Sequence, residues 1–170
     1  ASSVMGRAPD TLKEAISDAR LANAWRLHGR IAFARGEQSR AIALHTRALK
    51  HAELAHDSRA IGLTHYELAL CYKQVGDSGI VREHLTEAAS ALHAVGDRRH
   101  LALVHSLSAV LLAQSGRTDE AIAALRQGER LAMSIYGAVH QAEFAGMRNM
   151  RGLVVDRKLL GDAAFRMALT

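Results

Sequence analysis

Ten histidines are the first residues of this chain whose type could do chemistry. Imidazole binds metal ions, and metal sites on helices are typically marked by closely spaced ligands such as H-E-x-x-H. No such spacing occurs, and Cys71 is the single cysteine, so no cysteine pair exists. His45 stands at a position that recurs 40 residues later as Leu85 and then as Leu125. We therefore expect packing roles for the histidines, and neither a metal ion nor a cofactor.

Nucleophiles and carboxylates form no recognisable catalytic arrangement either. Cys71 lies between Leu70 and Tyr72 in an apolar helical stretch, where a buried, inert thiol is expected rather than a nucleophile. Glu83 and Glu87 are four residues apart, and their simplest interpretation is a solvated helix face. The sequence contains no glycine-rich phosphate loop and no nucleophile elbow. We predict that this segment is not an enzyme.

Basic side chains are the remaining chemical feature. The chain has 22 Lys and Arg residues against 17 Asp and Glu residues, which gives a net charge of +5 and a pI near 9.9. These charges are dispersed and interleaved, as on a mildly basic, solvated helical surface. With 1 Trp, 3 Tyr and 3 Phe, the chain has few rings on which bases could stack. Nucleic-acid binding is therefore the alternative rather than the preferred interpretation.

The elements that must position these side chains recur every 40 residues. Gly36, Gly76 and Gly116 mark the interval, and a fixed period of this size is typical of repeat arrays. Apolar residues follow a helical period between the glycines. Glycine can end a helix and aspartate can begin the next, so Asp57 and Asp97 are expected to cap the first helices of their units. The same register holds for Gly29, Ala69 and Ala109, for Ala41, Val81 and Ala121, for Ala48, Ala88 and Gly128, and for Ala52, Leu92 and Ala132.

Each unit is thus predicted to be a helix, a tight turn and a second helix. The units span about 19–57, 58–97 and 98–137, and residues 138–170 form a partial or divergent fourth unit. We expect an all-α fold and a single array that is a fragment of a longer protein. An apolar C-terminal end suits either that interpretation or self-association, and its residues are Leu159, Leu160, Phe165, Met167 and Leu169.

The pattern resembles the tetratricopeptide repeat (TPR), whose signature is W-x2-L-G-x2-Y followed by A-x3-F. Trp25, Gly29 and Ala41 match it in the first unit, and Leu68 and Tyr72 match it in the second. The closing proline of the signature is absent from all three units. Other positions depart from the signature as well, namely His28, Ala32, His45, Ser108 and Leu112. The period is similar to that of a longer variant found in large bacterial transcription regulators and in polarity adaptors. The resemblance implies a right-handed α-solenoid of antiparallel helix pairs.

The resemblance also implies a concave groove, lined by the first helix of each unit, in which a partner binds. That groove would be basic and partly apolar, which suits an extended or helical protein segment that carries acids among apolar anchors. By register, its residues are Asn23, Arg26, Arg30, Phe33, Tyr66, Leu70, Lys73, Gln74, Ser106, Val110, Gln114, Arg151, Val155 and Lys158.

The function expected from these features is a protein-interaction scaffold, as the repeat segment of a bacterial multidomain transcriptional regulator. Two alternatives stay open, namely a nucleic-acid-binding helical repeat and a sensor domain for a peptide or small effector. No stretch of about 18 apolar residues predicts a membrane span, and nothing resembles a secretory leader. With a single cysteine, the expected location is the cytoplasm.

Overall fold

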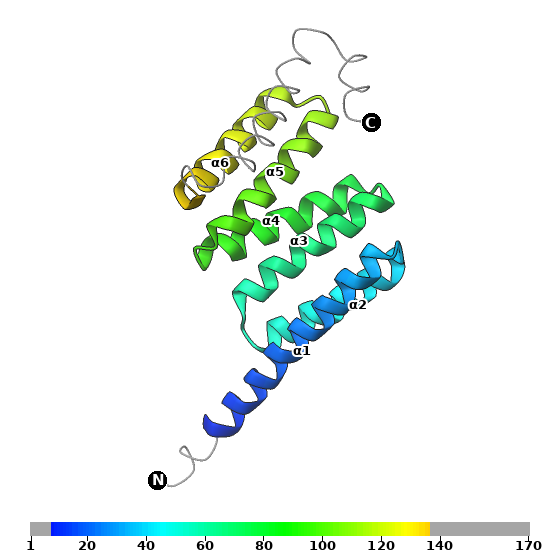
Figure 1. The fold of residues 1–170 in the computed structure, drawn as a ribbon, viewed down its shortest axis with the longest axis vertical. Helices are drawn as coiled ribbons and strands as arrows, with labels where there is room; N and C mark the ends of the chain where they lie inside the picture. Colours follow the sequence, from blue (N-terminus) through cyan, green and yellow to red (C-terminus); the bar gives the residue numbers. More distant parts are fainter. Residues whose placement is uncertain (1–7, 137–170) are drawn as a thin grey trace. The chain divides into compact units, whose positions relative to one another are not determined.

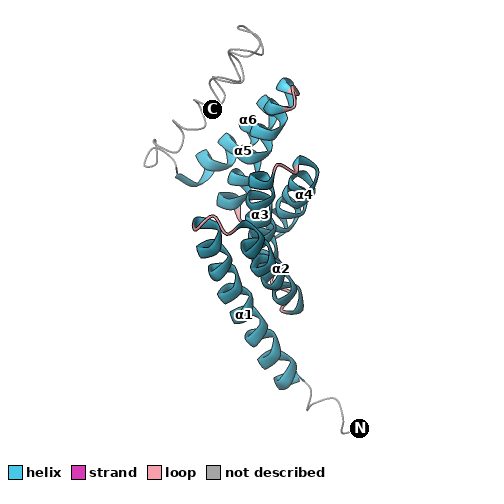
Figure 2. Ribbon diagram, turned by 90° about the vertical axis from the view of Figure 1, so that its right-hand side faces the viewer, coloured by secondary structure: helices cyan, strands magenta, loops and turns pink. Residues whose placement is uncertain are grey.

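The computed structural model describes residues 8–136, and every regular element in this range is an α-helix (Figures 1 and 2). The all-α prediction is confirmed for these residues. The six helices are α1 (Ala8–Ala34), α2 (Gln38–Leu54), α3 (Ser58–Val75), α4 (Ser78–Ala94), α5 (Arg98–Gln114) and α6 (Thr118–Tyr136). The fourth predicted unit lies outside the described residues, together with Arg151, Val155, Lys158 and the apolar residues near the C-terminus.

Helices that follow each other in the chain pack in pairs, as helical repeats do. The main contacts join α1 with α2, α3 with α4 and α5 with α6, and α2 also packs on α3. The described helices belong to two compact units, one with α1 to α4 and the other with α5 and α6. Among residues 8–136, no helix is long and apolar enough to cross a membrane.

The turns between the helices follow the predicted glycine and aspartate pattern. Glycines in these turns have left-handed φ angles, which L-residues with a side chain adopt only at a cost. Asp57 accepts a hydrogen bond from the backbone N–H of Ala60 at 2.9 Å, and Asp97 accepts one from His100 at 3.2 Å. Both predicted helix caps are thereby confirmed. The left-handed glycines are Gly36, Gly76, Gly96 and Gly116.

One turn has a histidine where the next equivalent turn has glycine. His56, between α2 and α3, has a φ of 51°, and Gly96 stands 40 residues later with a φ of 69°. A left-handed conformation brings the Cβ of an L-residue close to the following carbonyl oxygen. The α2–α3 turn therefore contains local backbone strain that the α4–α5 turn lacks.

Small side chains form much of the core. Ala109, Ala121 and Leu125 are buried together between α5 and α6, and Ala32, Ala41 and Cys71 join α1, α2 and α3. Alanines at such positions let helix backbones approach closely and fill the interior without voids. The core therefore combines close helix contacts at the alanines with larger buried side chains such as Leu92 and Leu125.

The first helix is longer than the repeat register requires. The register places the first unit from about residue 19, whereas α1 begins at Ala8 and has 27 residues. Within the part before residue 19, Leu12 and Ile16 are exposed. From residue 11 onwards, the first fully buried side chain of α1 is Ala22, which packs with Ala52 and Ala60.

Candidate partner-binding surface

In the compact unit of α1 to α4, the predicted binding residues lie on α1 and α3, which contact each other directly. None of them is buried: Asn23, Arg30, Lys73 and Gln74 are exposed, and Arg26, Phe33, Tyr66 and Leu70 are half-buried. We call this set of eight residues the α1–α3 surface. It combines cationic, amide and apolar side chains that remain accessible to a partner within one compact unit.

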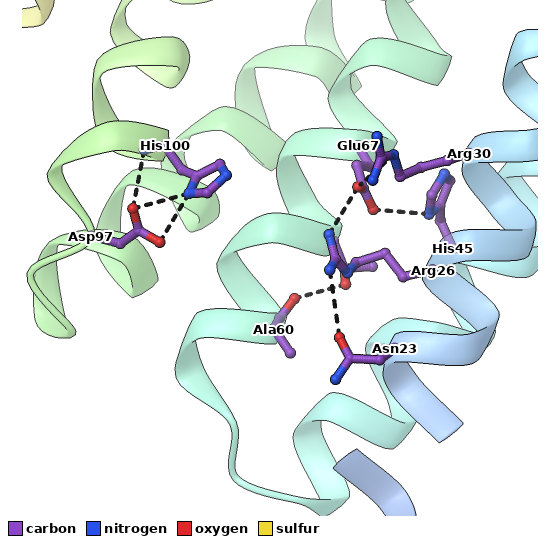
Figure 3. Close-up of polar contacts among 9 residues, drawn as sticks. Asn23, Arg26, Arg30, His45, Ala60, Glu67, Asp97 and His100 are labelled. Carbon is purple, nitrogen blue, oxygen red and sulfur yellow. Dashed lines mark hydrogen bonds and ion pairs between the residues drawn. The ribbon is translucent and has the colours of Figure 1, made fainter. Parts of the chain in front are cut away.

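Arg26 does not act as a free cation on this surface, because Glu67 of α3 binds it (Figure 3). Its Nη1 donates a hydrogen bond to Glu67 Oε1 at 3.1 Å, and only 20% of the Arg26 side chain is exposed. Its Nη2 also donates to Asn23 Oδ1 at 3.5 Å. Arg26 therefore joins α1 to α3 and has its charge compensated. The predicted set contained Arg26 but not Glu67.

Arg30 is the accessible arginine beside this pair. Its Nε lies 3.9 Å from Glu67 Oε1, and 64% of its side chain is exposed. Lys73 on α3 is exposed as well. A carboxylate that approaches the α1–α3 surface from solvent would thus meet Arg30 and Lys73 before it met Arg26.

His45 contacts the other oxygen of Glu67 from inside the helix packing. Only 1% of its side chain is exposed, and its Nδ1 lies 3.4 Å from Glu67 Oε2. Burial, together with the charges of Arg26 and Arg30, lowers the pKa of His45 to about 4. The histidine is therefore neutral at neutral pH.

Gly29 leaves the room that the His45 ring occupies. A Cβ built at Gly29 would lie 2.6 Å from Cε1 of the ring, far inside van der Waals contact. In the two later units the same phases have the pairs Ala69 with Leu85 and Ala109 with Leu125. In the first repeat unit, glycine therefore replaces the alanine of the later units and leaves space for the imidazole ring of His45.

Glu67 is the acid of this cluster, and its pKa is strongly shifted. Burial raises the pKa of its carboxyl group to about 7, while Arg26 and Arg30 act in the opposite direction. Its Oε2 is buried and, among the described residues, has no hydrogen-bond partner, and the same holds for His45 Nδ1 and Arg26 Nε. Buried polar atoms are usually hydrogen-bonded, so this cluster keeps unused hydrogen-bonding capacity next to the surface.

A signal in the sequence could have revealed this cluster. Forty residues before and after Glu67 stand Leu27 and Leu107, and forty residues after His45 stands Leu85. Two polar residues thus replace leucine at apolar phases, and they face each other in the structure. A polar residue at an apolar phase needs a partner when it is buried, and the two exceptions together indicate a contact.

The other predicted residues are distributed as follows. Ser106, Val110 and Gln114 lie on α5 in the second unit and are half-buried or exposed. Ser106 Oγ donates to the backbone carbonyl of Ala102 at 3.0 Å. Arg151, Val155 and Lys158 lie outside the described residues.

The groups considered for chemistry are placed as follows. Cys71 is fully buried, and burial, with a further contribution from Glu67, raises the pKa of its thiol to about 11. At neutral pH it is a thiol rather than a nucleophilic thiolate. Within the described part of the chain, no group of three or more His, Cys, Asp or Glu residues could hold a metal ion.

Comparisons with known proteins add no family to these observations. The chain matches no model of a known protein family, and no curated protein is significantly similar to it.

Proposed function

We propose that this chain is a protein-interaction scaffold of the tetratricopeptide kind, with its helix pairs arranged as a right-handed solenoid. Paired helices, left-handed glycines at a 40-residue interval and aspartate caps support this proposal. We propose further that it is the repeat segment of a bacterial multidomain transcriptional regulator and acts in the cytoplasm. The resemblance to repeats of such regulators supports this part.

The proposed partner is an acidic amphipathic protein segment bound at the α1–α3 surface. One observation carries this assignment: the exposed Arg30 and Lys73 lie on two contacting helices whose neighbouring side chains, Phe33 and Leu70, are only half-buried. Partly exposed apolar side chains can hold the anchors of a helical segment, and the adjacent cations attract its acids and set its register. This chain is proposed to bind its partner rather than to catalyse a reaction, in keeping with the protonated thiol of Cys71.

Charge reversal at the accessible cations tests this function. The probe is a synthetic Leu- and Glu-containing peptide of about 20 residues, long enough to populate a helix. The double variant Arg30→Glu/Lys73→Glu should bind it about tenfold more weakly than the unmodified chain, because exposed ion pairs contribute up to about 1 kcal/mol each. Titration calorimetry measures the affinity, and binding should weaken as salt increases.

The matched control reverses Arg82 and Arg126, which are exposed on the second helices of their pairs. It changes the net charge equally and should leave peptide binding within about twofold of the unmodified affinity. Arg26 is left unchanged, because its replacement would leave Glu67 unpaired. Equal losses in both double variants would refute the α1–α3 surface as the binding site. Tight, strongly salt-dependent binding of an oligonucleotide, lost equally in both variants, would favour the nucleic-acid alternative instead.

A further inference from the structure

The α1–α3 surface already contains a carboxylate that binds its arginines. Glu67 Oε1 lies 3.1 Å from Arg26 Nη1 and 3.9 Å from Arg30 Nε. We propose that Glu67 competes with the acidic groups of the partner for these arginines. It thereby determines which segments can bind here. This inference rests on the proposed function, because it concerns the same surface and the same class of partner.

The geometry of the contact supports competition. Arginine binds carboxylates through charge-assisted hydrogen bonds, and Glu67 takes the position on Arg26 that a partner's Asp or Glu would need. Because Glu67 belongs to the same chain, its effective concentration at the arginines is high, in the millimolar range or above. To bind Arg26, an external carboxylate must therefore displace Glu67, whereas the exposed Arg30 and Lys73 can be reached without displacement.

Glu67 also has a second partner available when it is displaced. Its Oε2 lies 3.4 Å from His45 Nδ1, and neither atom has a hydrogen-bond partner among residues 8–136. A neutral imidazole in the tautomer that carries its proton on Nδ1 can donate to this oxygen. The ring lies in the space that Gly29 leaves, and a small rotation of the carboxyl group towards it would offset part of the loss of Arg26.

The competitor changes the kind of partner that the surface selects. At Arg26 an acid alone gains little, since it replaces a contact that Glu67 already makes. A segment with apolar side chains beside its acids gains additional contacts at Phe33 and Leu70, which are half-buried. We therefore infer specificity for amphipathic acidic segments over purely acidic ones.

The test compares Glu67→Gln with the unmodified chain, using the Leu- and Glu-containing peptide as the probe. Binding is measured at about pH 8, above the pKa of Glu67, so that the carboxyl group is ionised. Glutamine keeps an acceptor for Arg26 but removes the competing charge, so the peptide should bind about fivefold more tightly. A peptide with Gln in place of every Glu should show no such gain. Glu67→Asp, which keeps the charge, should resemble the unmodified chain. Glu83→Gln removes the same charge at an exposed position on α4 and should change the affinity by less than twofold.

The outcomes separate this inference from the proposed function. If Glu67→Gln binds no more tightly while Arg30→Glu/Lys73→Glu still weakens binding, the competitor is refuted and the function stands. If neither the unmodified chain nor Glu67→Gln binds the peptide, the proposed function itself is refuted.

If Glu67→Gln does not fold, nuclear magnetic resonance of the unmodified chain decides. The Arg26 side-chain N–H resonance should shift when the peptide is added in proportion to binding, because the carboxylate that it contacts is exchanged. An unchanged Arg26 resonance at saturation would overturn the inference.

Discussion

Glu67 and His45 illustrate how two buried groups in contact can have opposite effects on stability. The pKa of Glu67 is raised from 4.5 to about 7, so the folded chain binds a proton between these values that the unfolded chain releases. The pKa of His45 is lowered from 6.5 to about 4, so here the unfolded chain binds the proton. The contribution of Glu67 to stability is lost as the pH rises from 4.5 to 7, and that of His45 is lost as the pH falls from 6.5 to 4.

This opposition predicts how Glu67→Gln changes the pH dependence of unfolding. The variant lacks the Glu67 titration, so its stability relative to the unmodified chain should increase between pH 4.5 and pH 7. The increase should be about 2–3 kcal/mol. Urea unfolding at several pH values in this range measures it. A constant difference between the two chains would show that the carboxyl group titrates normally.

The turns show how a single residue affects the way a helix ends. His56 occupies a left-handed position that glycine holds in the equivalent turn at Gly96. Glycine adopts this conformation without a clash of its Cβ, whereas histidine does so at the expense of stability. The α2–α3 connection is therefore a place where the fold can be improved without any change in the core.

We predict that His56→Gly stabilises the chain by about 1 kcal/mol, since the relief of strain exceeds the added flexibility of the unfolded state. The midpoint of urea unfolding should rise accordingly. Gly96→Ala is the reciprocal variant, and its midpoint should fall by a similar amount. If His56→Gly lowers the midpoint, the histidine side chain stabilises the turn, and the predicted relief of strain is wrong.

These turns also explain which parts of the structure could be predicted from sequence. A left-handed glycine and a capping aspartate act within a few residues, so Asp57 and Gly76 are sufficient to predict where α3 begins and ends. Arg26 and Glu67 are 41 residues apart, and their contact requires α1, α2 and α3 to be packed already. The register located Arg26 on the accessible face of α1, but it could not reveal that its charge was compensated.

At the scale of the whole molecule, helix pairs with small residues at their contacts account for each compact unit. Ala69 lies in the compact unit of α1 to α4, and Ala109 lies in the compact unit of α5 and α6. Both are completely buried, and they occupy the same position of the repeat. Tightly packed interiors resist added volume, because neighbouring side chains must leave their preferred rotamers. The same substitution can therefore test the register in both units.

Replacement of Ala69 or Ala109 by Leu should destabilise the chain by about 1–3 kcal/mol. Amide hydrogen exchange should show where the loss occurs: in α3 and α4 for Ala69→Leu, and in α5 and α6 for Ala109→Leu. Ala123→Leu, at an exposed position of α6, serves as the control and should alter neither stability nor exchange. Unchanged unfolding of both core variants would mean that the repeat register is wrong.

The contact of His45 with Glu67 has a further consequence for how such an array can evolve. Forty residues after His45 and Glu67 stand Leu85 and Leu107. Among residues 8–136, this polar pair therefore occurs at the junction between the first two repeats and is not repeated at the next junction. Duplication or exchange of whole repeats would place Glu67 against leucine or His45 without its acid, and either mismatch leaves a buried polar group uncompensated. The order of the first two repeats is therefore encoded in the chain itself, and recombination between units is restricted at this junction.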